Sequence, residues 1–184
     1  MNKNVKLIIA FLLVVILVAG AYVLYEKLSE EYAPEVDIEN GADTTEDFRA
    51  PDFEVTDKDG NTVTLSSFFG KPIVLNFWAS WCPPCKAEMP DFEAAYKELG
   101  DEVHFIMVNS TGGRETLETA KKFLAGTDYT FPVYFDTKYD AAMTYGISSL
   151  PTTIFIDRDG NLVTYANSML DAETLRRGID MIME

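Results

Sequence analysis

The pattern of apolar and polar positions divides the chain into three parts. Residues 7–24 form an uninterrupted apolar run without a charge. Over residues 25–49 this pattern disappears and acidic residues dominate. From residue 50 onward, short apolar stretches alternate with polar ones. The sequence therefore predicts an N-terminal segment (1–24) with the length of a membrane span, an acidic tether (25–49) that lacks the apolar surface needed to fold, and one folded domain (50–184).

The domain reads as strands alternating with helices. Phe53 and Val55 alternate with polar neighbours, and Asp59-Gly60 marks a tight turn before a second strand. The apolar run 73–77 predicts a central strand covered on both faces. Further strands are expected at 103–109, 131–135, 152–156 and 161–166, and helices at 66–70 (one turn), 86–99, 115–124, 139–145 and 171–183. This order indicates an α/β domain with a mixed central sheet.

The helix expected over residues 86–99 contains a proline and is followed by a glycine. Pro90 removes one backbone hydrogen bond and crowds the preceding turn, so a kink is expected there. Gly100 is expected to end the helix, because glycine is the common residue in the left-handed conformation after a helix.

The only two cysteines, Cys82 and Cys85, stand at the predicted junction of the central strand and this helix. Unpaired N–H groups and the positive end of the helix dipole favour thiolate there, and thiolate attacks disulfides. A zinc site would need four ligands, and the single histidine, His104, lies in another predicted strand. A purely structural disulfide closing so short a loop would remove little chain entropy. The pair therefore indicates dithiol–disulfide exchange, with no metal and no cofactor beyond the bridge itself.

The two cysteines are expected to have different roles. Cys82, at the exposed first position of the helix, is the expected nucleophile, and Cys85, one turn further in, is the expected resolving thiol. Pro83 and Pro84 lack N–H groups, so they cannot donate hydrogen bonds to the sulfurs. Fewer donors leave the Cys82 thiolate less stabilised, which favours a reductant over an oxidant.

The segment Asn-Phe-Trp-Ala-Ser-Trp-Cys-Pro-Pro-Cys at residues 76–85, followed by Glu88 and Pro90, resembles the active site of membrane-anchored thioredoxin-like proteins of the TlpA/ResA type. A second segment, residues 146–157, also matches. The resemblance implies a thioredoxin-like fold with an N-terminal β-hairpin and a βα insertion within residues 111–135. It further implies that Pro151 is cis and lies against the disulfide.

The same resemblance suggests roles for further residues. Thioredoxin has a buried aspartate where this chain has Asn76, and an amide cannot exchange the proton of Cys85. Glu88, three residues after Cys85 on the same helix, is the expected replacement, although an ordinary surface glutamate is the alternative. The substrate-binding residues are expected to be Trp81, Pro83, Leu150 and Pro151, which would form a groove for an extended peptide.

The N-terminus and the charge bear on location and partners. Lysines precede the apolar run and glutamates follow it, so the positive-inside rule predicts a single-pass membrane protein with its domain outside the cytoplasm. A cleavable signal peptide is the alternative, since Ala19-Gly20-Ala21 offers a cleavage site. The net charge of −15 argues against a nucleic-acid partner.

Taken with the resemblance, these features predict an extracytoplasmic reductase of disulfides in exported proteins, such as apocytochromes c or a partner enzyme. Because that space has no thiol buffer, a membrane thiol carrier is the expected electron donor. Three rival functions remain open: a disulfide-forming oxidase, a peroxiredoxin-type peroxidase, and a binding module whose cysteines are incidental.

Overall fold

The computed structural model describes Asn2 and residues 19–20, 39–40 and 49–184. The chain separates into two units, Met1–Glu35 and Val36–Glu184. In the first unit only Asn2, Ala19 and Gly20 are described, so most of the predicted apolar segment and tether lies outside the described residues. In the part of the chain that is described, no helix has the length and hydropathy needed to span a membrane.

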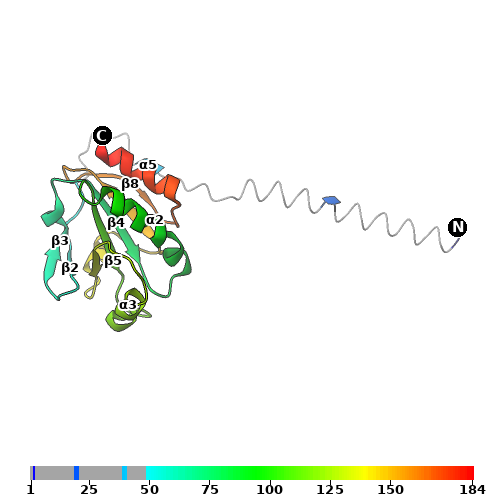
Figure 1. The fold of residues 1–184 in the computed structure, drawn as a ribbon, viewed down its shortest axis with the longest axis horizontal. Helices are drawn as coiled ribbons and strands as arrows, with labels where there is room; N and C mark the ends of the chain where they lie inside the picture. The colour runs from blue at the N-terminus through cyan, green and yellow to red at the C-terminus, as the bar shows by residue number, and fades with distance from the viewer. Residues whose placement is uncertain (1, 3–18, 21–38, 41–48) are drawn as a thin grey trace. The chain divides into compact units, whose positions relative to one another are not determined.

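The second unit has the alternation of strands and helices that the sequence predicts (Figure 1). Its elements are β1 (Glu39–Asn40), β2 (Glu54–Thr56), β3 (Thr62–Thr64), the 3₁₀ turn η1 (Leu65–Phe68), β4 (Ile73–Trp78), α2 (Pro83–Leu99), β5 (His104–Asn109), α3 (Leu117–Leu124), β6 (Val133–Phe135), α4 (Asp140–Thr144), β7 (Thr152–Ile156), β8 (Leu162–Ala166) and α5 (Ala172–Met183).

The strands form one mixed sheet in the order β1-β8-β7-β4-β5-β6-β2-β3. The central strand β4 is parallel to β5 and antiparallel to β7. All six residues of β4 are buried, as its apolar sequence predicts for a strand covered on both faces. The pairing of Phe77 with Thr152 places the end of β4 beside the start of β7, so α2 and Pro151 meet at the same edge of the sheet.

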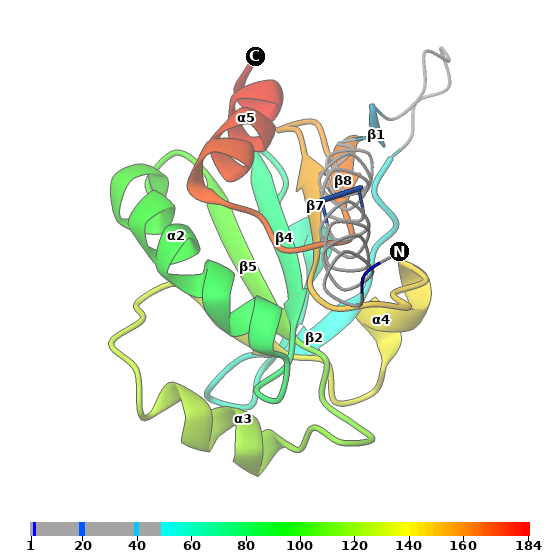
Figure 2. The same ribbon diagram turned by 90° about the vertical axis from the view of Figure 1, so that its right-hand side faces the viewer.

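Two apolar layers cover the sheet. Helices α2 and α5 lie on one side and α4 on the other (Figure 2). The first layer contains Met89 and Phe92 of α2 together with Ile179 of α5. The second contains Leu65 of η1 and Ala141 of α4. Met89 of α2 and Met107 of β5 are fully buried.

Two hairpins turn through the same short sequence motif. Residues 57–61 read Asp-Lys-Asp-Gly-Asn and residues 157–161 read Asp-Arg-Asp-Gly-Asn. In each, the first aspartate accepts hydrogen bonds from the backbone N–H groups two and four residues later, at 2.9 and 2.8 Å. Local side-chain hydrogen bonds therefore define both turns, β2–β3 and β7–β8.

Helix α2 ends at the predicted glycine, but the backbone conformation of that glycine differs from the prediction. Gly100 follows the helix but has a right-handed φ of −61°. A Cβ at Gly100 would lie 2.7 Å from the carbonyl oxygen of Tyr96, so glycine is needed for close packing and not for a left-handed turn. The helix continues through Pro90, which lies on its exposed side.

The sheet extends into the segment predicted as a tether. Strand β1 pairs with β8, with Glu39 opposite Tyr165, and Arg49 forms a bridge with Asn161. The tether prediction is therefore wrong for these residues. An edge strand is held by backbone hydrogen bonds, which do not require the apolar side chains on which the prediction depended.

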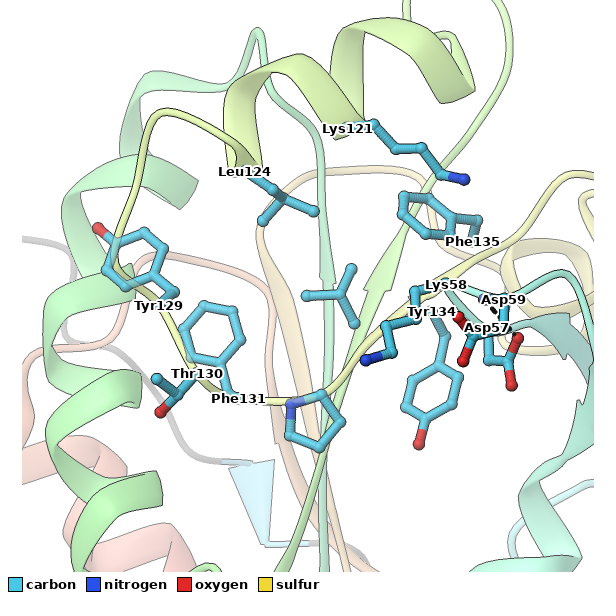
Figure 3. Close-up of a pocket in the computed structure, with 12 residues that line it drawn as sticks. Asp57, Lys58, Asp59, Lys121, Leu124, Tyr129, Thr130, Phe131, Tyr134 and Phe135 are labelled. Carbon is cyan, nitrogen blue, oxygen red and sulfur yellow. Dashed lines mark hydrogen bonds between the residues drawn. The ribbon is translucent and has the colours of Figure 1, made fainter.

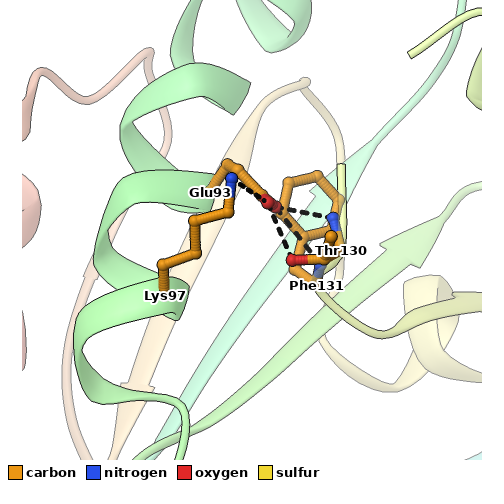
Figure 4. Close-up of polar contacts among 4 residues, drawn as sticks. All are labelled: Glu93, Lys97, Thr130 and Phe131. Carbon is orange, nitrogen blue, oxygen red and sulfur yellow. Dashed lines mark hydrogen bonds and ion pairs between the residues drawn. The ribbon is translucent and has the colours of Figure 1, made fainter. Parts of the chain in front are cut away.

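The predicted βα insertion is present as α3 and β6, and a buried glutamate joins it to α2 (Figure 4). The Glu93 carboxylate accepts hydrogen bonds from the Thr130 N–H at 2.8 Å, the Thr130 hydroxyl at 2.7 Å and the Phe131 N–H at 3.3 Å. Lys97 forms an ion pair with the same carboxylate at 3.0 Å. Burial is the largest single effect and raises the pKa of Glu93. The hydrogen bonds from Thr130, with smaller contributions from Lys97 and Phe131, together outweigh it and hold the pKa below its usual value.

Candidate active site

Cys82 and Cys85 form a disulfide at the start of α2, with an S–S distance of 2.01 Å. Cys82 is the N-cap residue, and the Cys85 N–H donates to Cys82 Sγ at 3.2 Å. Pro83 and Pro84 occupy the first two helical positions, where their missing N–H groups leave no intrahelical hydrogen bond unmade. The same backbone arrangement would offer the Cys85 N–H to a Cys82 thiolate in the reduced protein.

The predicted exposure of Cys82 is wrong for this disulfide-bonded state. Cys82 is only 2% exposed and Cys85 is fully buried, and both pack in the layer that contains Trp78. In this state the Cys82 sulfur is bonded to Cys85 Sγ and accepts a hydrogen bond from the Cys85 N–H. The neighbours Trp81, 41% exposed, and Pro83 reach solvent instead.

Pro151 has the cis peptide bond that the family resemblance implies. It is buried at the start of β7, and the preceding Leu150 is half-buried between the two apolar layers. Because β7 lies beside β4, these two residues reach the same edge of the sheet as Trp81 and the cysteines. The structure thus brings together four residues predicted for substrate binding: Trp81, Pro83, Leu150 and Pro151.

Glu88 is buried, so the alternative interpretation as an ordinary surface glutamate is wrong. It is 1% exposed and accepts hydrogen bonds from Asn76 Nδ2 at 2.9 Å and from the Leu170 N–H at 3.0 Å. Burial raises the pKa of Glu88 to about 7, because loss of water disfavours the charged form more than these two hydrogen bonds favour it. A carboxyl group one turn after Cys85 can therefore gain or lose a proton near neutral pH.

The loop between β5 and α3, residues 110–116, also belongs to the site, and the sequence did not indicate it. Glu115 is 1% exposed, and its carboxylate accepts hydrogen bonds from the N–H and the hydroxyl of Ser80, which stands two residues before Cys82. Arg114 lies over the ring of Trp81, 4.7 Å from its centroid. The insertion was predicted, but its contact with Ser80 is between residues 35 positions apart and has no local sequence signal.

His104 lies apart from this site, and no metal-binding group accompanies the cysteines. His104 begins β5, and the centroid of its ring lies 5.3 Å from the centroid of the Phe68 ring. Burial, with a smaller effect of Lys71, lowers its pKa. Within residues 49–184 and the few described before them, no three His, Cys, Asp or Glu side chains form a group that could hold a metal ion.

A cavity of about 680 Å³ lies away from the cysteines, between α3, β6 and the β2–β3 turn (Figure 3). Apolar and aromatic side chains such as Leu124, Phe131 and Tyr134 line it, together with Lys58 and Lys121. Neither cysteine and none of the predicted site residues contributes to its wall. This cavity is therefore separate from the cysteine pair, which lies where α2 and β7 begin.

A cysteine pair at a helix start, a cis-proline at the adjacent strand and a mixed sheet between helices define a thioredoxin-like thiol–disulfide oxidoreductase. More particularly, the chain belongs to the AhpC/TSA family, whose profile matches residues 48–165, and within it to the ResA group of thiol–disulfide oxidoreductases.

Individual relatives support this membership. The chain is 34% identical to the thiol-disulfide oxidoreductase ResA of Bacillus thuringiensis over 166 residues, covering 89% of this chain and 88% of that protein. It is also 34% identical to the thioredoxin-like protein YneN of Bacillus subtilis over 155 residues, covering 84% and 85%. The crystal structure of the pneumococcal exposed lipoprotein thioredoxin (Etrx1) of Streptococcus pneumoniae matches with a TM-score of 0.64 at 35% identity, covering 71% of this chain and 98% of that one.

Proposed function

We propose that this protein is an extracytoplasmic reductase, which passes electrons from its Cys82/Cys85 dithiol to disulfides in exported proteins. The observation that carries the proposal is the placement of the Cys82–Cys85 bridge at the start of α2, with the buried Glu88 one turn further along the helix. Apocytochromes c and partner enzymes are the substrate proteins proposed from the family resemblance.

The proposed location outside the cytoplasm has two supports. The uncharged apolar run 7–24 between lysines and glutamates has the length and charge pattern of a single membrane anchor. One relative is named an exposed lipoprotein thioredoxin. A membrane thiol carrier would then supply electrons, because the extracytoplasmic space has no thiol buffer to reduce the bridge.

In the proposed reaction the Cys82 thiolate attacks one sulfur of the substrate disulfide. The substrate S–S bond breaks, and its other sulfur leaves as a thiolate that takes up a proton. Cys85 then loses its proton and attacks the Cys82 sulfur, which releases the second substrate thiol. The substrate gains two electrons, and the protein ends with the Cys82–Cys85 bridge.

Glu88 is proposed to accept the proton of Cys85 in this second step. Its pKa of about 7 lets it act as a base when the protein reduces a substrate and as an acid when a donor reduces the bridge. Asn76, which donates a hydrogen bond to Glu88 Oε1, would orient the carboxyl group without exchanging a proton itself.

The reduction potential of the Cys82/Cys85 pair tests the direction of electron flow. We expect the full chain, equilibrated in dithiothreitol or glutathione buffers, to have a potential near that of thioredoxin, about −270 mV. A potential near −120 mV, typical of strong oxidants, would instead make the protein a disulfide-forming oxidase.

Two further measurements distinguish the proposed reductase from a peroxidase and from a binding module. Ala79 stands where a peroxidatic Thr-x-x-Cys motif would have threonine, so no turnover of hydrogen peroxide is expected. A binding module with incidental cysteines would keep its cellular role after Cys82→Ser and Cys85→Ser together, whereas the proposed reductase would lose it.

A further inference from the structure

The β5–α3 loop, residues 110–116, is held at two points beside the active site. At the first, the buried Glu115 carboxylate accepts the N–H and hydroxyl hydrogen bonds of Ser80, the latter at 2.9 Å. The hydroxyl of Thr119 donates to the same carboxylate at 2.5 Å. A buried carboxylate with three donors joins the loop to the segment that leads into Cys82.

The second point of attachment is Gly112, which lies against the hydroxyl end of the Tyr139 side chain. Its N–H donates to the Glu115 carbonyl at 2.7 Å, and the Glu115 N–H donates back at 2.9 Å. A Cβ at Gly112 would lie 1.9 Å from the Tyr139 hydroxyl oxygen, and the φ of Gly112 is +143°. Gly113 follows with a φ of +57°. Both glycines are therefore needed for the path that the loop takes to Arg114.

Arg114 lies next to Glu115 in this loop and is exposed. Its guanidinium carbon is 4.7 Å from the centroid of the Trp81 ring, and Trp81 directly precedes Cys82. Among the described residues, four ion pairs are formed, and their cations are Lys97, Lys138, Arg176 and Arg177. Within that same part of the chain, Arg114 forms no hydrogen bond or ion pair, although the protein has 30 acidic residues.

The contact between Arg114 and Trp81 is not a major source of stability, because both side chains are exposed to solvent, where a cation–π pair contributes little. Its consequence is the placement of a positive charge beside the nucleophile of a protein whose net charge is −15. When one face of a guanidinium lies on a ring, its N–H donors still point outward in the plane, in the fork that suits a carboxylate.

We propose that Arg114, held on Trp81, binds a carboxylate side chain in the substrate segment that carries the target cysteine. This inference rests on the proposed function, since it concerns substrate disulfides exchanged at Cys82. Charge complementarity supports it: the acidic surface repels an acidic segment in general, and Arg114 offers that segment one attractive position at the site. Arg114 would thus select, among cysteine-bearing segments, those with an aspartate or glutamate nearby.

The test uses the reduced full chain and short peptides capped at both ends. Each peptide has one cysteine in a mixed disulfide with 2-mercaptoethanol, which is uncharged, and has Glu or Gln at one of the three positions on either side. Exchange yields the peptide thiol, 2-mercaptoethanol and the Cys82–Cys85 bridge. We expect the second-order rate constant to be about threefold larger for Glu than for Gln at one or more positions, and this ratio to fall with added salt.

Two variants with the same change of charge separate a local effect from a general one. Arg114→Met should bring the Glu/Gln ratio to one. Arg158→Met is the matched control, because Arg158 is an exposed arginine in the β7–β8 turn, at the end of β7 away from Pro151, and it should retain the ratio.

Equal rates for Glu and Gln peptides at every position in the unchanged protein would overturn this inference alone. A preference for the Glu peptide that persists in Arg114→Met would also overturn it. The same holds if Arg114→Met lowers the rate constant equally for both peptides, because that result is expected if the arginine acts only on the Cys82 thiolate. A chain that exchanges neither peptide would overturn the proposed function and this inference with it.

Discussion

Glu88 combines burial with a position one turn after Cys85 in α2. Its two hydrogen bonds come from Asn76 and from the backbone of Leu170, in the loop before α5. These partners favour the carboxylate, but burial outweighs them and raises the pKa of Glu88 to about 7. Three elements, β4, α2 and the β8–α5 loop, therefore contribute to the proton affinity of a single side chain.

Replacing Glu88 by glutamine should slow reduction of the Cys82–Cys85 bridge. Below pH 7 the protonated Glu88 can donate to the departing Cys85 thiolate, and glutamine cannot. We compare second-order rate constants for reduction of the bridge, calculated from the concentration of dithiothreitol thiolate. We expect Glu88→Gln to lower this constant about a hundredfold at pH 6, which is the smaller end of the effect of general acid catalysis. The variant should also lack the inflection near pH 7 in the plot of the rate constant against pH. Stopped-flow tryptophan fluorescence measures both.

Glu102→Gln is the matched control for that measurement, because Glu102 is exposed in the turn between α2 and β5. It should retain both the rate and the inflection. An inflection near pH 7 that persists in Glu88→Gln would assign that titration to another group and contradict the proton-transfer role.

Helix α3 and the loop before it contribute to the site through one buried carboxylate. Thr116 caps the helix and its side chain accepts a hydrogen bond from the Thr119 N–H. Glu115, immediately before this cap, receives the hydrogen bonds of Ser80. The helix start and the active-site corner are thus parts of one hydrogen-bonded group, so a change in the insertion would be felt beside Cys82.

Glu115→Gln should destabilise the protein by about 1–3 kcal/mol, because an amide presents only one acceptor oxygen to the donors that the carboxylate now satisfies. Urea unfolding followed by circular dichroism measures the loss. Glu118 is an exposed acid in the first turn of α3, and Glu118→Gln should lower the free energy of unfolding by less than about 1 kcal/mol. Equal losses in the two variants would show that Glu115 acts only through its charge at the helix start.

For the molecule as a whole, a buried acid with a raised pKa makes stability depend on pH. Glu88 titrates near 4.5 when unfolded and near 7 in the folded protein. Between these values the folded state holds the proton more tightly than the unfolded state does. The contribution of Glu88 to the free energy of unfolding is therefore full below pH 4.5 and is lost as the pH rises to about 7.

We expect the free energy of unfolding of the unchanged protein, relative to that of Glu88→Gln, to fall by up to about 3 kcal/mol between pH 4.5 and pH 7. Taking the difference between the two proteins cancels the other titrating groups, such as Glu93 with its lowered pKa. Denaturant unfolding at several pH values measures this difference. A constant or rising difference across this range would contradict the raised pKa.

Much of the fold could be read from local patterns. The apolar run in β4, the two Asp-x-Asp-Gly-Asn turns and the Asp171 cap of α5 act through neighbours in the chain, so their structures follow from short segments. Strand β1 could not be predicted, because its pairing with β8 depends on backbone groups supplied by a distant edge.

The amino-acid sequence was enough to predict the mixed α/β fold, the pair Cys82 and Cys85 at a helix start, and the acid Glu88 at helical spacing from them. These features depend on residue type and on short spacings. Three features are evident only in the folded chain: Cys82 is buried in the disulfide-bonded state, Glu88 is desolvated, and Glu115 and Arg114 contact Ser80 and Trp81. The physical reason is that burial and contacts between distant segments arise when helices and loops pack across the sheet.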